Sequence, residues 1–160
     1  METKHIFIGN YVNRTAKDRI GFIIENYSDF EGYRHSYMEN VINIMIAIRE
    51  YERRKPDDEL GICVQVSGHT SDITASRALE RVSLQKCFED MRIPEGTFSD
   101  DHEHELIATA IFEWDLMERE YRIFNSFLKT LDPVNRDIFK IYIRREKRVA
   151  DLASDLQIER

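Results

Sequence analysis

The sequence predicts an all-α protein, and three observations support that prediction. Apolar residues recur at spacings of three and four along most of the chain, which is the period of an amphipathic helix. The three prolines, Pro56, Pro94 and Pro133, each stand where one helical pattern ends or the next begins. No glycine follows Gly96, so residues 97–160 are expected to form helices joined by tight turns.

Composition restricts the class of protein before any element is placed. The 160 residues are 42% hydrophobic and 33% charged, which excludes low-complexity disorder and collagen-like or disulfide-stapled chains. Cys63 and Cys87 form no CxxC motif, and we interpret them as reduced thiols. No apolar stretch approaches the ~20 residues of a membrane helix, and the first residues carry no secretory hydrophobic segment. We therefore expect a soluble cytoplasmic protein with no membrane contact.

Three helices are predicted before residue 100. The first spans residues 15–29 and contains Gly21, which costs about 1 kcal/mol relative to alanine. The second spans residues 33–54, and the third spans residues 71–91 after a loop. The apolar seam of the second helix contains Tyr37, Val41, Ile44, Ile48 and Tyr51, widened by Met38, Ile42 and Met45. The residues expected to be buried on the third helix are Ala75, Ala78, Leu79, Val82 and Phe88.

The strongest periodicity lies between residues 104 and 131, where apolar residues step alternately by three and four. This pattern predicts one long helix, either as the spine of an intramolecular bundle or as half of a dimeric coiled coil. The bulky rings of Trp114, Tyr121 and Phe124 favour the bundle, because two-stranded zippers prefer branched aliphatic residues. The seam contains Ile107, Ala110, Trp114, Met117, Tyr121, Phe124, Leu128 and Leu131.

A pair of short helices is predicted near the C-terminus. Asp132 and Pro133 suit the N-cap and first position of a helix over residues 133–145. A turn at residues 145–148 leads to a second helix over residues 149–156. The alanine on the inner side of this second helix permits the close crossing of a helix-turn-helix. The residues expected to face inward are Val134, Ile138, Phe139, Tyr142, Val149, Leu152, Ala153 and Leu156.

This spacing resembles region four of the bacterial sigma factors and the phage sigma-like regulators of the ArpU and RinA families. Those proteins share a Leu-Pro start, an arginine three residues after the proline, an aliphatic-aromatic helix and a DLA-x-x-L-x-I core. A shorter segment, VQVSGHTSDITASRAL at Val64–Leu79, resembles the stretch before a long helix in small phage regulators. The matching tail positions are Leu131, Pro133 (with Asp132 inserted), Arg136, Ile138, Phe139, Tyr142, Asp151, Leu152, Ala153, Leu156 and Ile158.

The resemblance implies a transcriptional regulator of a phage or prophage. Such a protein would act in the bacterial host cytoplasm through double-stranded promoter DNA, RNA polymerase or both. It would comprise an acidic helical bundle, residues 1–131, and a sigma-region-four-like helix-turn-helix, residues 132–160. The recognition helix of such a module, which contacts the base edges, would begin near Glu159 and Arg160. We therefore expect this chain to stop before its recognition helix.

The distribution of charge agrees with an interface in the tail. The whole chain contains 23 Lys/Arg and 30 Asp/Glu. Residues 134–160 carry seven of the basic and five of the acidic residues, so residues 1–133 carry 16 basic and 25 acidic residues. DNA affinity comes mostly from phosphate neutralisation, so the basic tail is the candidate interface. An ordinary solvated helix surface is the alternative for the same side chains. The candidate DNA-contacting residues are Arg136, Lys140, Arg144, Arg145, Lys147, Arg148 and Arg160.

No other cluster in the sequence indicates catalysis or a cofactor. His102 and His104 lie among carboxylates that could join them on zinc, but two residues apart on a helix their imidazoles diverge. An acidic start of a solvated helix is the favoured interpretation. The sequence contains no glycine-rich phosphate loop and no GxSxG motif. We therefore expect no enzyme, no metal and no cofactor.

Two further functions stay open. An acidic body could inhibit a host enzyme by occupying its basic nucleic-acid channel, and one contiguous acidic surface would favour that alternative. The residues that would form this surface are Asp57, Asp58, Glu59, Asp100, Asp101, Glu103 and Glu105. A self-assembling module, or a homodimer, is supported by the heptad seam alone.

Overall fold

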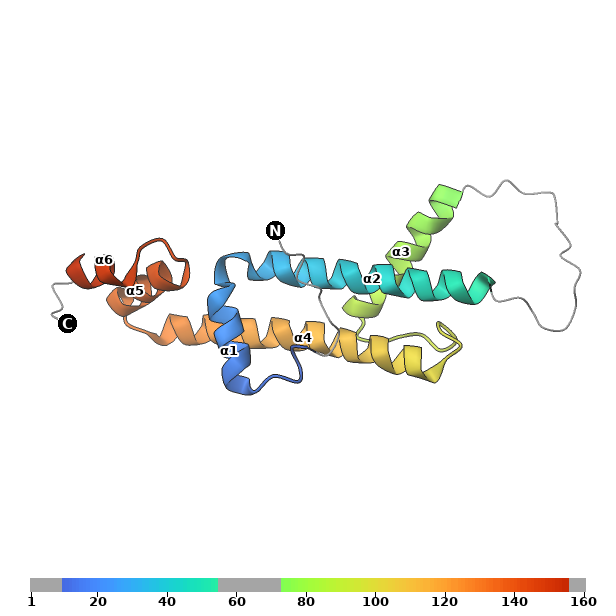
Figure 1. Ribbon diagram of the computed structural model, residues 1–160, viewed down its shortest axis with the longest axis horizontal. Coiled ribbons are helices and arrows are strands. Elements are labelled where there is room, and N and C mark those ends of the chain that lie inside the picture. Colours follow the sequence, from blue (N-terminus) through green and yellow to red (C-terminus); the bar gives the residue numbers. More distant parts are fainter. Residues whose placement is uncertain (1–9, 55–72, 156–160) are drawn as a thin grey trace, which may run out of the picture. The chain divides into compact units, whose positions relative to one another are not determined.

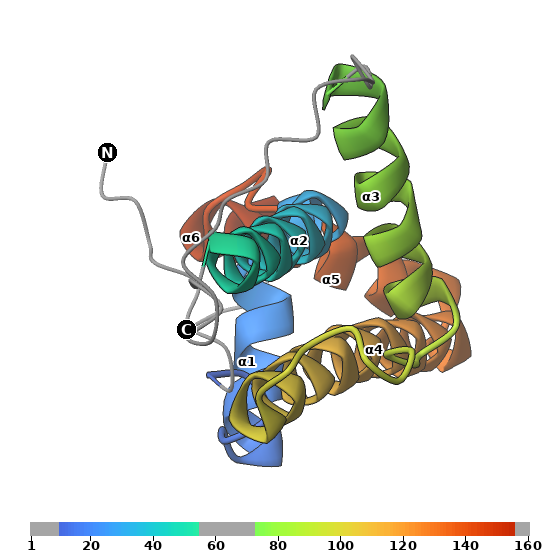
Figure 2. The ribbon, with the colours of Figure 1, turned by 90° about the vertical axis from the view of Figure 1, so that its right-hand side faces the viewer.

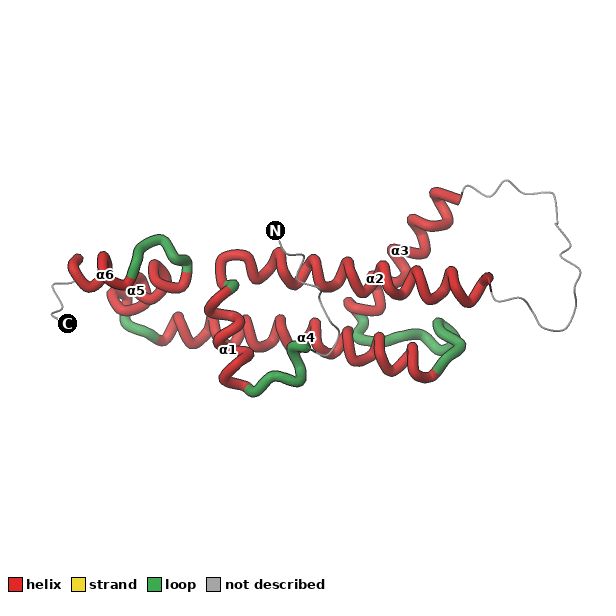
Figure 3. The backbone as a smooth tube through the Cα atoms, viewed as in Figure 1, coloured by secondary structure: helices red, strands yellow, loops and turns green. Residues whose placement is uncertain are grey.

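The computed structural model describes residues 10–54 and 73–155 (Figure 1). Within those residues the regular secondary structure is entirely helical, with no strand (Figure 3), which confirms the all-α prediction. Cys63 and much of the segment Val64–Leu79 lie outside the described residues. The elements are α1 (Ala16–Glu25), the 3-10 helix η1 (Tyr27–Asp29), α2 (Phe30–Arg54), α3 (Ile73–Glu89), α4 (Asp101–Thr130), α5 (Pro133–Ile143) and α6 (Val149–Asp155).

The chain forms two compact units, and each takes part of α2 and part of α4. The described residues of unit 1 are 37–54 and 73–115, and those of unit 2 are 10–36 and 116–155. This division differs from the separation expected near residue 131, since α5 and α6 group with α1 and the second half of α4. Neither unit is one continuous stretch of sequence.

Unit 1 is built around the adjacent parts of α2 and α4, with α3 inclined to both (Figure 2). The seam predicted for α2 is buried at its first positions and becomes exposed toward its end, where Tyr51 is open to solvent. The buried apolar side chains of this core are Met38, Val41, Ile42, Met45, Leu84, Cys87, Phe88, Ile107, Ala110 and Ile111. Among them lies one charged residue, Glu113, which is completely shielded from solvent.

The burial predicted for α3 is wrong except at Phe88. Ala75 and Ala78 are exposed, and the exposed fractions of Leu79 and Val82 reach 72% and 53%. The reason is that α3 turns its charged side toward α2, through ion pairs that the apolar spacing does not reveal. These pairs are Arg77 with Glu50 at 3.3 Å, Arg81 with Glu39, and Glu80 with both Arg49 and Arg53.

Unit 2 is joined by polar contacts to α4 from the segment before α1, from α1 and from the start of α2. The hydroxyl of buried Tyr11 donates to Oε2 of Glu120 at 2.8 Å, and Nε of Arg19 donates to Oε1 of the same carboxylate at 2.8 Å. Arg34 pairs with Glu118 at 2.5 Å. The predicted first helix is shorter than expected, because α1 ends at Glu25 and a 3-10 turn leads into α2.

The heptad pattern correctly predicts one long helix, α4. Ile107, Ala110, Met117, Phe124 and Leu128 are buried, while Trp114, Tyr121 and Leu131 are half-buried. The half-buried rings contact other helices of the same chain: Trp114 meets Phe88 edge-on at 5.5 Å, and Tyr121 stacks on Phe30 at 4.6 Å. The intramolecular alternative therefore accounts for the seam. The homodimer, for which the heptad seam was the only support, stays a prediction.

Candidate nucleic-acid interface

The first helix of the tail begins at the predicted place. Asp132 has the extended backbone of an N-cap, and its Oδ1 accepts a hydrogen bond from the backbone N–H of Asn135 at 3.0 Å. Pro133 occupies the first turn, where its missing N–H costs nothing. Hydrogen bonds, first of all the one from the backbone N–H of Asn135, lower the pKa of the Asp132 carboxyl below its ordinary 3.8.

The buried side of α5 differs from the expected one. Ile143 is almost fully buried, and the ring of half-buried Phe139 lies 6.4 Å from that of Phe124 on α4. Two residues predicted to be buried are open instead, with exposed fractions of 65% for Val134 and 45% for Tyr142. One residue corresponds to about 100° of helix rotation, so Tyr142 is directed away from the interior that Ile143 enters.

The turn after α5 is closed by a Schellman motif. The backbone N–H of Glu146 donates to the carbonyl of Ile141 at 3.1 Å, and that of Arg145 donates to the carbonyl of Tyr142 at 3.0 Å. Arg145 occupies the residue position where glycine is usual, with a left-handed φ of 56°. The turn then leads to α6, whose Leu152 is buried and whose Ala153 is half-buried.

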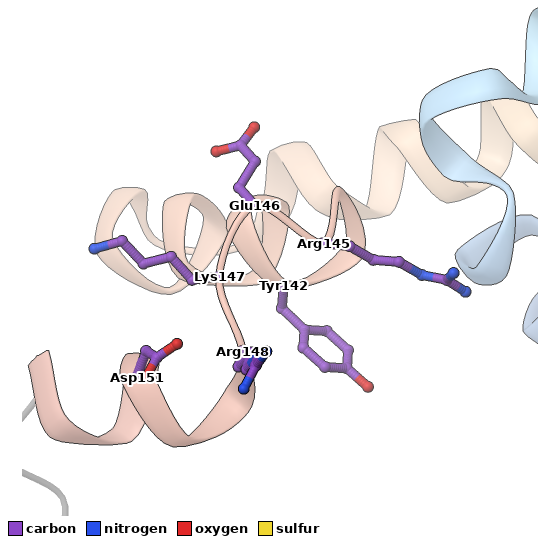
Figure 4. A pocket seen from close by; sticks show the side chains of 6 residues that line it. All are labelled: Tyr142, Arg145, Glu146, Lys147, Arg148 and Asp151. Carbon is purple, nitrogen blue, oxygen red and sulfur yellow. The ribbon is translucent and has the colours of Figure 1, made fainter.

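A shallow concave surface of about 500 Å³ lies at this turn, and we call it the α5–α6 surface (Figure 4). Figure 4 shows the Tyr142 ring projecting from α5 between Arg145 and Arg148, while Lys147 and Glu146 point in other directions. The surface therefore combines one aromatic ring with positive charge on one side and two carboxylates elsewhere on its rim. The lining residues are Tyr142, Arg145, Glu146, Lys147, Arg148 and Asp151.

The structure brings together only some of the predicted contact residues. Arg145, Lys147 and Arg148 line the α5–α6 surface, and exposed Arg144 lies beside them, 3.7 Å from Glu146. Half-buried Arg136 and Lys140 lie along α5 and do not line this surface. Arg160, Leu156 and Ile158 lie outside the described residues, and so does the start of the expected recognition helix.

Cations in the tail and in the rest of the chain have different surroundings. Many arginines of the body, though not Arg92, pair with described glutamates on another helix, as in Arg19–Glu120, Arg34–Glu118, Arg49–Glu80, Arg53–Glu80, Arg77–Glu50 and Arg81–Glu39. Among the side chains that the structure describes, no carboxylate forms an ion pair with Arg136, Lys140, Arg145 or Arg148. The positive charge of the tail is therefore not neutralised by these carboxylates and remains available to an external anion.

Sequence reasoning missed Tyr142 as a surface residue. The apolar spacing placed it in the core, although a tyrosine at the end of a helix and next to a basic run also fits a solvent-facing position. An aromatic body with a polar tip commonly lies half in and half out of the interior. The signal was therefore its position two residues before Arg144 and three before Arg145, and not its hydrophobicity.

The acidic and histidine-rich start of α4 shows no metal-binding arrangement. His102 and His104 are both exposed, and the backbone N–H of His102 donates to Oδ1 of Asp100 at 2.8 Å. In residues 10–54 and 73–155, no group of three or more His, Cys, Asp and Glu side chains is arranged to hold a metal ion. Asp101 and Glu105 lie at the surface as well, whereas residues 57–59 of the expected acidic surface lie outside the described part.

Comparison with protein-family models, with curated proteins and with solved structures found no match to this chain. No helix in the described part is long and apolar enough to cross a membrane. The candidate interface is therefore defined by its own residues: a helix fixed by Asp132, a turn fixed by a Schellman motif, and exposed cations around Tyr142.

Proposed function

We propose that this protein is a DNA-binding transcriptional regulator of the phage sigma-like kind, and that its basic tail contacts the phosphates of promoter DNA. In this proposal the protein binds and does not catalyse. RNA polymerase is the second proposed partner, because regulators with sigma-like tails work beside that enzyme. The resemblance of residues 131–158 to sigma region four supports the class of function. The positive charge of the tail supports its contact with DNA phosphates.

The observation that supports the proposal most strongly is the contrast between paired and unpaired cations. Residues 134–148 contain six Lys/Arg and two Asp/Glu, for a net charge of +4. Arg145 and Arg148 are exposed and form no ion pair with the described carboxylates. Phosphate contacts release condensed counterions, which makes such a cluster a favourable site for a duplex even on an acidic protein.

The alternative of an acidic inhibitor receives less support. Such a protein needs carboxylates that are free to meet the basic channel of an enzyme. Glu39, Glu50, Glu80, Glu118 and Glu120 instead pair with arginines of the same chain. Of the seven carboxylates named for the acidic surface, Asp100, Asp101, Glu103 and Glu105 are described and lie together at the start of α4, which is the support that the alternative retains. We favour the regulator because the tail combines positive charge with the resemblance.

Binding to labelled duplex DNA, measured by fluorescence anisotropy at several salt concentrations, tests the proposal. We expect affinities of about 10⁻⁴–10⁻⁶ M at physiological salt, the usual range for binding to phosphates alone. Replacing Arg144, Arg145, Lys147 and Arg148 by glutamate should abolish binding. The slope of log K against log salt should fall by about 0.9 for each phosphate that the variant no longer neutralises.

A matched control separates the tail from the total charge. It replaces four cations elsewhere by glutamate, which lowers the net charge of −7 by the same amount. None of these four forms an ion pair with a described carboxylate: Lys17, Lys86, Arg92 and Lys129. This variant should retain most of the binding. Equal loss in both variants, or binding that survives reversal of the tail, would show that the tail is not the DNA contact.

A further inference from the structure

The backbone at Arg145 distinguishes this residue from the other cations of the tail. Its φ of 56° lies in the left-handed region, which disfavours side chains with a Cβ atom. Two backbone hydrogen bonds of the Schellman motif span the residue and hold this conformation. The Cα–Cβ direction of Arg145 is therefore set by the turn, and its guanidinium is presented from a fixed point.

We propose that Arg145 is the principal phosphate-binding residue of the proposed DNA contact, with Tyr142 and Arg148 as its partners. This inference rests on the proposed function and makes it specific: the turn, and not the polar side of α5, holds the DNA backbone. The phosphodiester-binding site consists of these three side chains, which all line the α5–α6 surface.

Three observations select Arg145 and Arg148 from the seven candidates and add Tyr142, which was not one of them. Tyr142, Arg145 and Arg148 all line the concave surface, and Figure 4 shows the ring between the two arginines. Arg144 is partly occupied by Glu146 at 3.7 Å. Arg136 and Lys140 are half-buried along α5 and lie outside this surface.

The chemistry of the three side chains suits a phosphate diester. Two guanidinium groups offer N–H donors in a planar fork that matches phosphate oxygens. The phenol of Tyr142 offers an O–H donor on the same surface, and tyrosine is among the residues that contact DNA phosphates. Glu146 points away from Tyr142 in Figure 4, while Asp151, the second carboxylate of the lining, lies on the Arg148 side of the surface.

A second residue in the same backbone conformation provides an internal control. Met91 follows α3 with a φ of 51°, and the N–H of Arg92 donates to the carbonyl of Cys87 at 3.0 Å, again as a Schellman end. The hollow beside Met91 is lined by two carboxylates and one guanidinium, so its surroundings are not basic. A left-handed φ is therefore not enough to identify a phosphate-binding residue. The inference for Arg145 depends on the basic residues and the tyrosine around it.

The experiment compares Arg145→Gly with Met91→Gly in the 160-residue chain. Both changes relieve the same backbone cost, so both should raise the midpoint of thermal unfolding by about 2–4 °C. Only Arg145→Gly should weaken binding to a labelled duplex, by several-fold at low salt. It should also lower the salt slope by about 0.9. Arg145→Lys, which keeps the charge, should retain most of the slope.

Two further variants complete the test. Tyr142→Phe removes only the phenolic donor and should weaken binding less than Arg145→Gly does, whereas Lys17→Gln removes one exposed cation of the body and should leave binding unchanged. If tail reversal abolishes binding but Arg145→Gly binds like the parent chain, the inference fails and the proposed function stands. If Lys17→Gln weakens binding as much as Arg145→Gly, the inference fails too. If the parent chain does not bind duplex DNA, both fail together.

Discussion

The hydroxyl of Tyr37 donates a 2.5 Å hydrogen bond to Oε2 of Glu113, and the exposed fractions of the two side chains are 1% and 0%. The bond joins α2 to α4 within the apolar interior of unit 1. A carboxylate at such a place depends on its donors, because water cannot replace them.

Removing the donor should destabilise unit 1. Tyr37→Phe keeps the ring and deletes only the hydroxyl, so we expect the free energy of unfolding to fall by about 1.5–3 kcal/mol, the usual contribution of a hydrogen bond to a charged group. Glu113→Gln keeps an acceptor and should cost less. Urea denaturation followed by the fluorescence of Trp114 measures both. A Tyr37→Phe protein as stable as the parent would mean that the other contacts of Glu113 suffice.

The contact between Phe88 and Trp114 predicts a large effect of a core truncation. Phe88 is buried and meets the indole at 80°. Phe88→Ala should therefore cost about 3–5 kcal/mol and shift the emission of Trp114 to longer wavelength. Phe127→Ala, the same change at an exposed position of α4, should stay within about 0.5 kcal/mol. Similar losses in the two variants would contradict the packing described for unit 1.

Tyr11 makes the protein sensitive to alkali. Burial, and then the hydrogen bond to Glu120, raise the pKa of Tyr11 far above its ordinary 10.0. The unfolded chain ionises first, so the stability that Tyr11 contributes is complete below pH 10 and falls as the pH rises further. Burial also raises the pKa of Tyr27 and Cys87, which act in the same direction.

Urea unfolding between pH 8 and pH 11 checks this expectation. The parent chain should lose stability steeply above pH 10, and Tyr11→Phe should show a shallower decline from a lower starting value. Parallel pH profiles of the two proteins would exclude Tyr11 as a source of the alkaline loss.

The lowered pKa of Asp132 predicts that acid destabilises the protein locally, at the start of α5. Its pKa is lower in the folded chain, so its contribution is present above pH 3.8 and disappears as the pH falls through the lowered pKa. Amide hydrogen exchange at Asn135 reports the cap directly, since that N–H is the donor. We expect its protection to fall on acidification in the parent chain and to vary much less in Asp132→Asn, which caps without titrating.

Local signals in the sequence were enough to predict the best-defined helices. The four heptads of α4 and the Asp132-Pro133 start of α5 each depend on neighbouring residues, and the structure confirms both. The class of fold follows from the same periodicity. The basic cluster of the candidate interface is likewise visible in the composition of residues 134–148.

Contacts between distant residues could not be predicted in this way. The apolar stripe of α3 suggests burial, but Arg77 and Arg81 turn the helix by pairing with glutamates about thirty to forty positions earlier. Glu113 looks like a surface residue until Tyr37 is known to face it. Glycine usually marks a left-handed backbone position in a sequence, but here the residue is Arg145. The shape of the turn, and with it the exposed position of Tyr142, therefore became visible only in the structure.

Each unit combines two separate stretches of the chain, so the two units are completed at different times during synthesis on the ribosome. All described residues of unit 1 have been synthesised once residue 115 is added, whereas unit 2 must wait for residues 116–155. At about 5–20 residues per second this takes about 2–8 s. During that time Tyr11 and Phe30 have been synthesised without Glu120 and Tyr121, their partners on the second half of α4. These two aromatic side chains of the nascent chain therefore lack part of their native surroundings until α4 is complete.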